Sequence, residues 1–434
     1  MNSIRQADGF PLLDRLDGLA RTPLQRARAL GLRAWYCSQL ADLPQAVAIG
    51  AQALALAESL SERTLTAQIR QRLGTALSML GRFDDALPHL QAVQAWADAE
   101  MRHEDLAEFH GNFAVALDNL GRPGEALPHH RRALESSFAA GDHAQRATQL
   151  ANHAVNRLNA GDVDSASALL TQARQLIRSF DLQGGSAAFA TVLQMQCARA
   201  TGRYRDALAL GDEAEALLRA SIPARLPVVE LQRGHCWLEL GQWARAGQAL
   251  RAPAVPLPPH YETRRLLLLA RLRHWQGLDP EPTLTQAERA APANGWPEVR
   301  MMATVERALC GPASASGAAL QALAEQAGQL GLEGSVLAAL LALALHEGSA
   351  DRARQALALA QRVEPSLRYR AEVAASAAQA LRLAGHGDEA REVARAGLAW
   401  VEGIAEQQVD AAFRESFLQR NPANVALRAH AGAA

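Results

Sequence analysis

Lysine is absent from this 434-residue chain, so all 44 of its basic residues are arginine. Several catalytic devices depend on a lysine: the phosphate-binding loop of nucleotide hydrolases, the Schiff base of covalent catalysts and the nucleotide site of kinases. None of them can be built from this chain alone. The sequence therefore predicts a protein that is not an enzyme of these classes.

Cysteine and long apolar runs are scarce as well. Four cysteines, at 37, 197, 236 and 310, are scattered without a Cys-x-x-Cys pair, which favours a reducing cytoplasm over a disulfide framework or a zinc site. The first residues, MNSIRQADGFPLL, lack the layout of a signal peptide. The longest apolar run, 336–345, is too short to span a bilayer. We expect a cytoplasmic protein that does not contact membranes.

Aromatic residues make up only 5% of the chain, whereas hydrophobic residues, largely Ala and Leu, make up 49%. Small apolar side chains suit closely packed helices better than sheets, which favour branched and aromatic residues. Basic and acidic residues are balanced at 44 and 45. A nucleic-acid partner needs a basic face, so we expect no direct nucleic-acid binding.

An internal repeat runs through most of the chain. The segments LGRFDDALPHL, from Leu80, and LGRPGEALPHH, from Leu120, share seven of eleven residues at an offset of 40. A Gly-x-x-x-x-Ala frame recurs at Gly81/Ala86, Gly121/Ala126, Gly161/Ala166, Gly202/Ala207, Gly241/Ala246, Gly348/Ala353 and Gly385/Ala390. The Gly predicts a left-handed helix end, and the Ala predicts a close crossing of two helices one turn later.

Helix, glycine turn and helix with paired small residues resembles the tetratricopeptide repeat family. That resemblance implies an all-α solenoid of helical hairpins in a right-handed superhelix. The usual unit has about 34 residues, so the 40-residue unit here implies slightly longer helices. HEAT-type repeats share the longer period but do not require this Gly-to-Ala spacing.

Proline-rich segments divide the predicted array. We predict an N-terminal cap at 1–19 and about six regular hairpins at 20–250. A proline-rich bend at 251–262 separates them from about four looser hairpins at 263–403. Residues 404–434 are predicted to form a closing helix and a tail, in which Phe413, Phe417 and Leu418 cover the last hairpin.

The string RESFLQRNPAN at 414–424 resembles the end of helical-repeat regions in large bacterial signalling and transcription regulators. In those proteins the repeats are the sensor and follow DNA-binding, cyclase or nucleotide-switch domains. The resemblance implies that this chain is either such a sensor portion or acts on separate partners.

Asparagine recurs where the first helix of each hairpin would line a concave groove. Asn112 and Asn152, and Asn119 and Asn159, are each 40 residues apart. An amide can donate and accept at once, so it can pair with the backbone of an extended peptide. Two interpretations stay open, namely contact with a ligand and hydrogen bonding between stacked helices. The candidate groove residues are Asn112, Asn119, Asn152, Asn156, Asn159, Gln68, Gln71, Arg72 and Arg157.

Histidine is concentrated between 89 and 153, but its spacing does not match a metalloprotease helix: four residues after His103 stands Ala107. We therefore expect packing or solvated histidines and no metal or other cofactor. Cys197 and Cys236 share one repeat position and are expected to be buried.

These patterns together predict a non-catalytic module whose groove binds a protein or peptide segment. We expect a sensor or partner-recruiting part of a bacterial signalling or transcription-regulatory system. Two alternatives stay open: a subunit or fragment of a switch ATPase or other enzyme whose catalytic domain lies elsewhere, and an assembly scaffold. The sequence indicates neither the ligand nor the pathway nor the oligomeric state.

Overall fold

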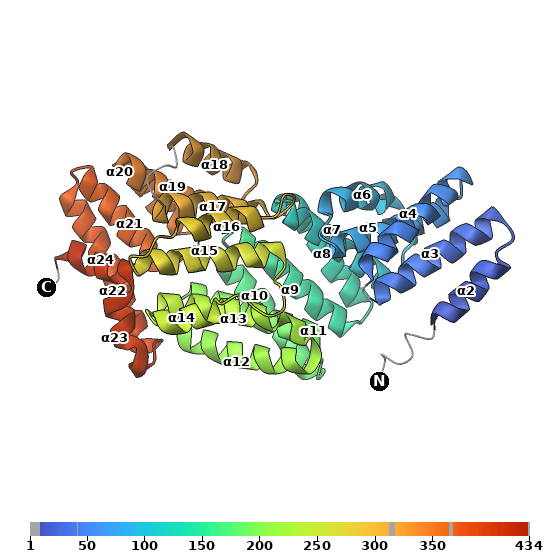
Figure 1. The fold of residues 1–434 in the computed structure, drawn as a ribbon, viewed down its shortest axis with the longest axis horizontal. Coiled ribbons are helices and arrows are strands. Elements are labelled where there is room, and N and C mark those ends of the chain that lie inside the picture. The colour runs from blue at the N-terminus through green and yellow to red at the C-terminus, as the bar shows by residue number, and fades with distance from the viewer. Residues whose placement is uncertain (1–8, 41, 312–316, 364–367, 433–434) are drawn as a thin grey trace. The chain divides into compact units, whose positions relative to one another are not determined.

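The computed structural model describes residues 9–40, 42–311, 317–363 and 368–432. Of the described residues 82% are helical, and none of them forms a strand (Figure 1). The predicted all-α hairpin class is confirmed. No helix in these ranges combines the length and apolarity needed to cross a bilayer.

The chain forms two compact units, Met1–Asp142 (unit 1) and His143–Ala434 (unit 2). In unit 1 a leading helix precedes three helical hairpins. Its helices are α2 (Gly9–Leu19), α3 (Pro23–Gln39), α4 (Leu43–Ser59), α5 (Arg63–Met79), α6 (Phe83–Glu100), α7 (His103–Asn119) and α8 (Pro123–Ala139).

Unit 2 continues with seven hairpins and two short closing helices. The first helix of each hairpin is α9 (His143–Asn159), α11 (Gly185–Ala200), α13 (Leu226–Glu239), α15 (Pro259–Trp275), α17 (Pro297–Cys310), α19 (Glu333–Glu347) or α21 (Arg370–Leu383). The second helices are α10 (Val163–Ser179), α12 (Tyr204–Ser221), α14 (Trp243–Ala249), α16 (Glu281–Ala290), α18 (Gly317–Gln329), α20 (Ala350–Ala360) and α22 (Gly387–Gln407). A 3-10 turn, η1 (Pro223–Arg225), precedes α13, and the chain ends with α23 (Ala411–Arg420) and α24 (Pro422–Ala431).

The repeated glycine ends seven of the described first helices, as the sequence predicts. Gly81 has a φ of 76°, and its N–H donates to the Ser78 carbonyl, while the next N–H, of Arg82, donates to the Leu77 carbonyl. This pair of bonds is a Schellman cap, which satisfies carbonyls that the helix itself leaves unpaired. The other six glycines of the frame also have positive φ.

The repeated alanine is where the two helices of a hairpin meet. Ala86, Ala126, Ala166, Ala207 and Ala246 are fully buried. A larger side chain at this point, one turn after the cap, would separate the backbones. The Gly-x-x-x-x-Ala spacing in the sequence therefore determines how the two helices of a hairpin pack.

Neighbouring hairpins stack through their first helices. Within unit 1, α3 contacts α5 and α5 contacts α7; within unit 2 the same holds from α9 to α21. One hairpin departs from this pattern, because α18 packs mainly against α19 and only weakly against α17. Residues 251–258 carry no helix and are largely exposed. The segment boundaries predicted from the sequence remain predictions.

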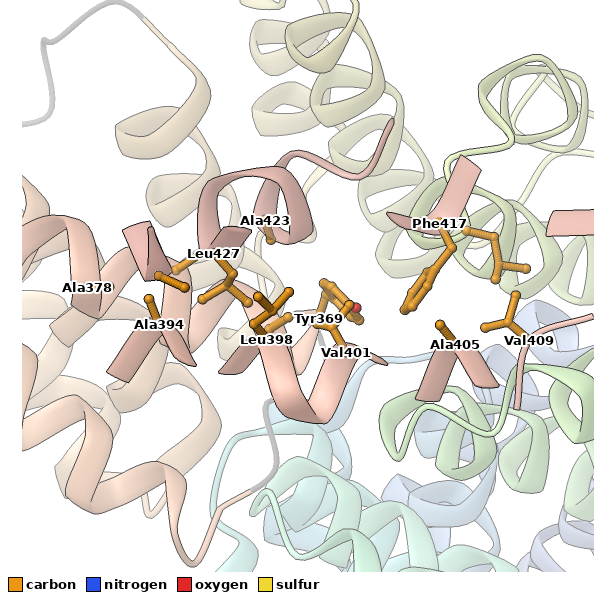
Figure 2. Packing of buried hydrophobic residues seen from close by; sticks show 14 of the residues in the cluster. Tyr369, Ala378, Ala394, Leu398, Val401, Ala405, Val409, Phe417, Ala423 and Leu427 are labelled. Carbon is orange, nitrogen blue, oxygen red and sulfur yellow. The ribbon is translucent and has the colours of Figure 1, made fainter. Parts of the chain in front are cut away.

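The tail contains two helices where the sequence predicts one. Pro422 begins α24 and Asn421 caps it, so the chain turns between α23 and α24. Phe417 of α23 is fully buried near Ala405 and Val409, and Leu427 of α24 lies beside Ala394 and Leu398 of α22 (Figure 2). The tail therefore covers the last hairpin, mainly through α24, which packs against both α21 and α22.

Limited digestion with trypsin is expected to cut after Arg251, because this residue is exposed and the helix-free segment 251–258 follows it. Gel electrophoresis would then show fragments 1–251 and 252–434. The fragments should still elute together in size-exclusion chromatography, because α13 contacts α15 and the tail contacts the turn before α14. A first cut between 70 and 240 would contradict this assignment.

Candidate binding surface

The first helices of unit 1 present one continuous exposed surface. On α3, α5 and α7 the exposed or half-buried residues recur three or four positions apart, so they lie on one side of each helix. Two contacts join the helices there, Arg72 with Trp35 and Asn112 with Thr75. We call this the α3–α5–α7 surface; it consists of Arg28, Leu32, Trp35, Gln68, Gln71, Arg72, Met79, Glu108, Asn112 and Asn119.

Large apolar side chains are grouped on this surface. Trp35, Leu32 and Met79 are 40%, 37% and 56% exposed. Single exposed apolar residues are ordinary, but a group on adjacent helices is typical of an interaction site. A small pocket of about 10 Å³ opens beside Trp35 between α3, α4 and α5. Its volume is that of roughly one water molecule.

Arg72 is the cation of this surface. Its guanidinium lies 6.0 Å from the centre of the Trp35 ring, a cation–π arrangement. Burial lowers the pKa of Arg72, and the carboxylate of Asp105 opposes that shift. In the described part of the chain, no carboxylate lies within ion-pair distance of Arg72. The guanidinium can therefore accept an anionic group from outside.

The predicted amides of unit 1 lie on this surface, and some of them are already hydrogen bonded. Asn112 Nδ2 donates to Thr75 Oγ1 over 3.4 Å, and Gln71 Nε2 donates to the same oxygen over 3.4 Å. Asn119 Nδ2 donates to the Val115 carbonyl of its own helix over 2.9 Å. Asn112 thus makes a long bond between stacked helices, and both interpretations of this residue keep geometric support.

The predicted amides of unit 2 separate into two kinds. Asn152 and Asn159 are half-buried on α9. Asn156 is fully buried and accepts hydrogen bonds from Arg157, so it offers no surface to a ligand. The burial of Asn156 could have been predicted from the repeat, because the equivalent residue 40 positions earlier is Ala116, which is in the core. Asn156 therefore does not line a surface, whereas Arg157 is half-buried and stays a candidate.

Three histidines of unit 1 make close polar contacts. His110 Nδ1 is 2.8 Å from His129 Nδ1, and His110 Nε2 is 3.0 Å from Asp98 Oδ1. His130 Nε2 is 2.7 Å from Asp118 Oδ2 and is buried. Among the described residues, no group of three or more His, Cys, Asp or Glu side chains converges as a metal site would require. These pairs link α6, α7 and α8.

In unit 2 the charged side chains of the first helices pair with one another in the interior. Arg199 on α11 lies 2.5 Å from Glu239 on α13, and both are buried. Arg271 and Arg368 both contact Glu306, and each also contacts Glu372. These buried charges are already paired and do not reach solvent, whereas the guanidinium of Arg72 on the α3–α5–α7 surface makes no ion pair.

The two cysteines at one repeat position are buried, as predicted. Burial raises the pKa of both the Cys197 and the Cys236 thiol to about 12. Thiols with such a pKa stay protonated and unreactive at neutral pH.

Acid should destabilise the chain through His129. Burial lowers the pKa of His129 to about 4, the charge of His110 adds to this, and Asp98 opposes it. Unfolded histidine has a pKa of about 6.5. Above pH 6.5 His129 is neutral in both the folded and the unfolded state and does not change the free energy of unfolding. As the pH drops from 6.5 towards 4, the unfolded state takes up the proton more readily and the free energy of unfolding falls.

Between pH 7 and pH 4 the wild type should lose about 1–2 kcal/mol more than His129→Gln, because the partial exposure of His129 screens its charge. Urea unfolding at several pH values, followed by circular dichroism, measures this difference. His103→Gln, at the exposed start of α7, is the matched control and should follow the wild type. Parallel curves for the wild type and His129→Gln would contradict the assignment.

Comparison with known proteins bears on the repeat and on the fold. Residues 63–137, which include α5, α6, α7 and most of α8, match the tetratricopeptide repeat family. No curated protein sequence matches the chain. The crystal structure of a Rap protein complexed with Competence and Sporulation Factor is similar at 12% identity and a TM-score of 0.50. The match covers 88% of this chain and 99% of that one.

Two further solved structures resemble the chain less closely. A tetratricopeptide repeat protein from Parabacteroides merdae is 13% identical with a TM-score of 0.46, over 64% of this chain and 98% of that one. A signal transduction ATPase with numerous domains and a tetratricopeptide repeat sensor, from Pyrococcus horikoshii, is 13% identical with a TM-score of 0.45. That match covers 66% of this chain and 45% of that one.

The matched repeats and the hairpin array lead to one conclusion. Tetratricopeptide repeats are protein-interaction modules. Residues 63–137 match the tetratricopeptide repeat family, and the described array has the fold of a tetratricopeptide-like helical solenoid.

Proposed function

We propose that the chain is a non-catalytic module that binds a peptide or protein segment on the α3–α5–α7 surface. The observation that carries the proposal is the exposure of Trp35, Leu32 and Met79 beside the unpaired guanidinium of Arg72. Apolar anchors with a few placed polar groups are the usual composition of a binding site.

Each kind of side chain has a separate role in this proposal. Covering the exposed part of Trp35 would contribute about 2 kcal/mol. Arg72 would pair with a carboxylate of the bound segment, and this pairing would gain strength from the partial burial of its guanidinium. Gln68, Asn112 and Asn119 would pair with the segment's backbone, which makes the recognition tolerant of sequence. Asn152 and Asn159 lie on α9 of unit 2 and are candidate ligand contacts of that unit, separate from this surface.

A chain of the same fold offers a precedent. The Rap protein was crystallised with Competence and Sporulation Factor, so an array of this fold can hold a partner. At 12% identity the likeness concerns the fold alone. The proposal for this chain therefore rests on its own exposed residues.

The biological setting that we propose is the sensor or partner-recruiting part of a bacterial signalling or transcription-regulatory system in the cytoplasm. The support is the resemblance of RESFLQRNPAN, at 414–424, to the end of such sensor regions. In this setting the partner is a protein or peptide, without direct contact to nucleic acid or membrane. A purely architectural scaffold is the alternative that the binding experiment below separates.

Substitution on the surface should weaken binding without unfolding the chain. Peptides selected from a random library on the full chain would be titrated by fluorescence anisotropy. Trp35→Ala and Arg72→Ala should each raise the Kd about ten-fold or more. Leu278→Ala is the control, because Leu278 is similarly exposed but lies in unit 2. Failure to select any peptide, or an equal effect of all three variants, would favour the scaffold.

The asparagines of α9 provide a second, internal comparison. Asn156→Ala removes a buried hydrogen-bonding group and should cost about 1–2 kcal/mol of stability. Asn152 is half-buried, so Asn152→Ala should change the free energy of unfolding by less than about 0.5 kcal/mol. Differential scanning calorimetry measures both values. A large loss of stability for Asn152→Ala, with peptide affinity intact, would assign that residue to stacking.

A further inference from the structure

A hollow of about 340 Å³ opens in unit 2 between α10 and α12, the second helices of two adjacent hairpins. Both helices pack against α11, and residues of α11 form the floor of the hollow. The volume lies within the range of sites that hold small molecules, which begins at about 300 Å³. We call it the α10–α12 hollow; it shares no residue with the α3–α5–α7 surface.

The α10–α12 hollow is open because its floor carries a small side chain. Ala198 of α11 lines it and is 1% exposed. Ala198 lies four residues before the turn glycine Gly202, and the residues at the same place in the two neighbouring hairpins are Arg157 and Trp237. A side chain of that size on the floor would occupy the space between α10 and α12. The hollow is therefore a feature of this junction rather than of the repeat.

Arg174 of α10 orients the polar group on the floor. Its Nη1 donates to Gln194 Oε1 over 2.7 Å, and its Nη2 donates to the two carboxylate oxygens of Glu213 over 2.7 and 2.8 Å. A guanidinium has only donors, so the Gln194 amide must turn its oxygen towards Arg174. The Nε2 group of Gln194 has no acceptor among the described residues. It is therefore free to donate to a ligand in the hollow.

A cation and an anion lie at the edge of the hollow, where α12 begins. Arg203 Nη1 and Asp206 Oδ2 are 3.9 Å apart, and their side chains are 42% and 55% exposed. Arg203 also donates from Nε to Thr201 Oγ1 over 3.0 Å. An ion pair with this separation and exposure contributes little to stability. Both charged groups can therefore exchange their mutual contact for a ligand group of opposite charge.

The charges around the hollow select the class of ligand. Arg174 and Glu213 neutralise each other, and Arg203 and Asp206 again sum to zero. A ligand with a single charge would leave either Arg203 or Asp206 without a counterpart, whereas a zwitterion satisfies both. The geometry therefore favours a small molecule that carries one carboxylate and one ammonium group.

We infer that the α10–α12 hollow binds a small zwitterion, either a free amino acid or a dipeptide. The ligand's carboxylate accepts hydrogen bonds from Arg203 and from Gln194 Nε2, and its ammonium group pairs with Asp206. Its apolar part lies against Leu210 on the α12 side, and Ser167 faces it from α10. Because α10 and α12 belong to adjacent hairpins, binding restrains the angle between these hairpins. This inference is independent of peptide binding in unit 1.

Isothermal titration calorimetry of the full chain tests this site. The probes are the standard L-amino acids and their dipeptides with alanine, each titrated alone, so that the two sources of the zwitterion are distinguished. The tightest probe is then compared with its N-acetyl form, which lacks the ammonium group, and with its amide form, which lacks the carboxylate. Each modified form should bind at least about ten-fold more weakly.

Two variants locate the binding in the hollow. Ala209→Trp places a large side chain on the exposed wall of the hollow and should raise the Kd about ten-fold or more. Its matched control is Ala216→Trp, which is seven residues later on α12, equally exposed and outside the hollow, and which should bind as the wild type does. Asp206→Asn should weaken the zwitterion about ten-fold but leave the N-acetyl form unchanged, because that form has no ammonium group.

Four results would overturn the inference. They are the failure of every probe to bind, equal affinity for the tightest probe and its two modified forms, an equal effect of Ala216→Trp and Ala209→Trp, and an equal effect of Asp206→Asn on the zwitterion and its N-acetyl form. Both tryptophan substitutions are at exposed positions, so circular dichroism should show the wild-type helix content in each.

Discussion

Glu239 is the residue on which the arrangement of unit 2 depends most. Its carboxylate receives Arg199 over 2.5 Å and the Tyr204 hydroxyl over 3.0 Å, and its backbone carbonyl receives Asn421. Burial opposes its ionisation, but the charges of Arg199 and His235 prevail and hold the pKa of Glu239 below its usual value. One buried residue thus joins α11, α12, α13 and the tail.

The interior of unit 2 contains more than one such group of paired charges. A buried carboxylate is tolerated only when its partners are complete, and the partners of Glu239 come from three other parts of unit 2. The Arg271, Glu306, Arg368 and Glu372 group repeats the same arrangement further along the array. These charges form ion pairs inside the unit, whereas the guanidinium of Arg72 in unit 1 makes no ion pair and lies on the α3–α5–α7 surface.

Part of the candidate surface follows from the sequence. The 40-residue offset placed Asn112 on a first helix, and the glycine frame fixed which side of that helix packs, so its half-exposed position was predictable. Trp35, Leu32 and Met79 could not be assigned in the same way, because an apolar residue on a helix normally indicates core. Asn156 is the opposite case: the sequence predicts a groove residue, but the side chain is fully buried. A polar side chain can be buried when neighbouring groups form hydrogen bonds with it.

The sequence by itself determined the helical hairpins, their glycine caps and their buried alanines, because these depend on residues within one or two turns of each other. Tertiary structure decided where unit 2 closes. The partners Asn421 and Glu239 are 182 residues apart, and no local periodicity relates them. Whether these two residues meet depends on how every hairpin between them stacks on the next. The contact is therefore a property of the folded chain.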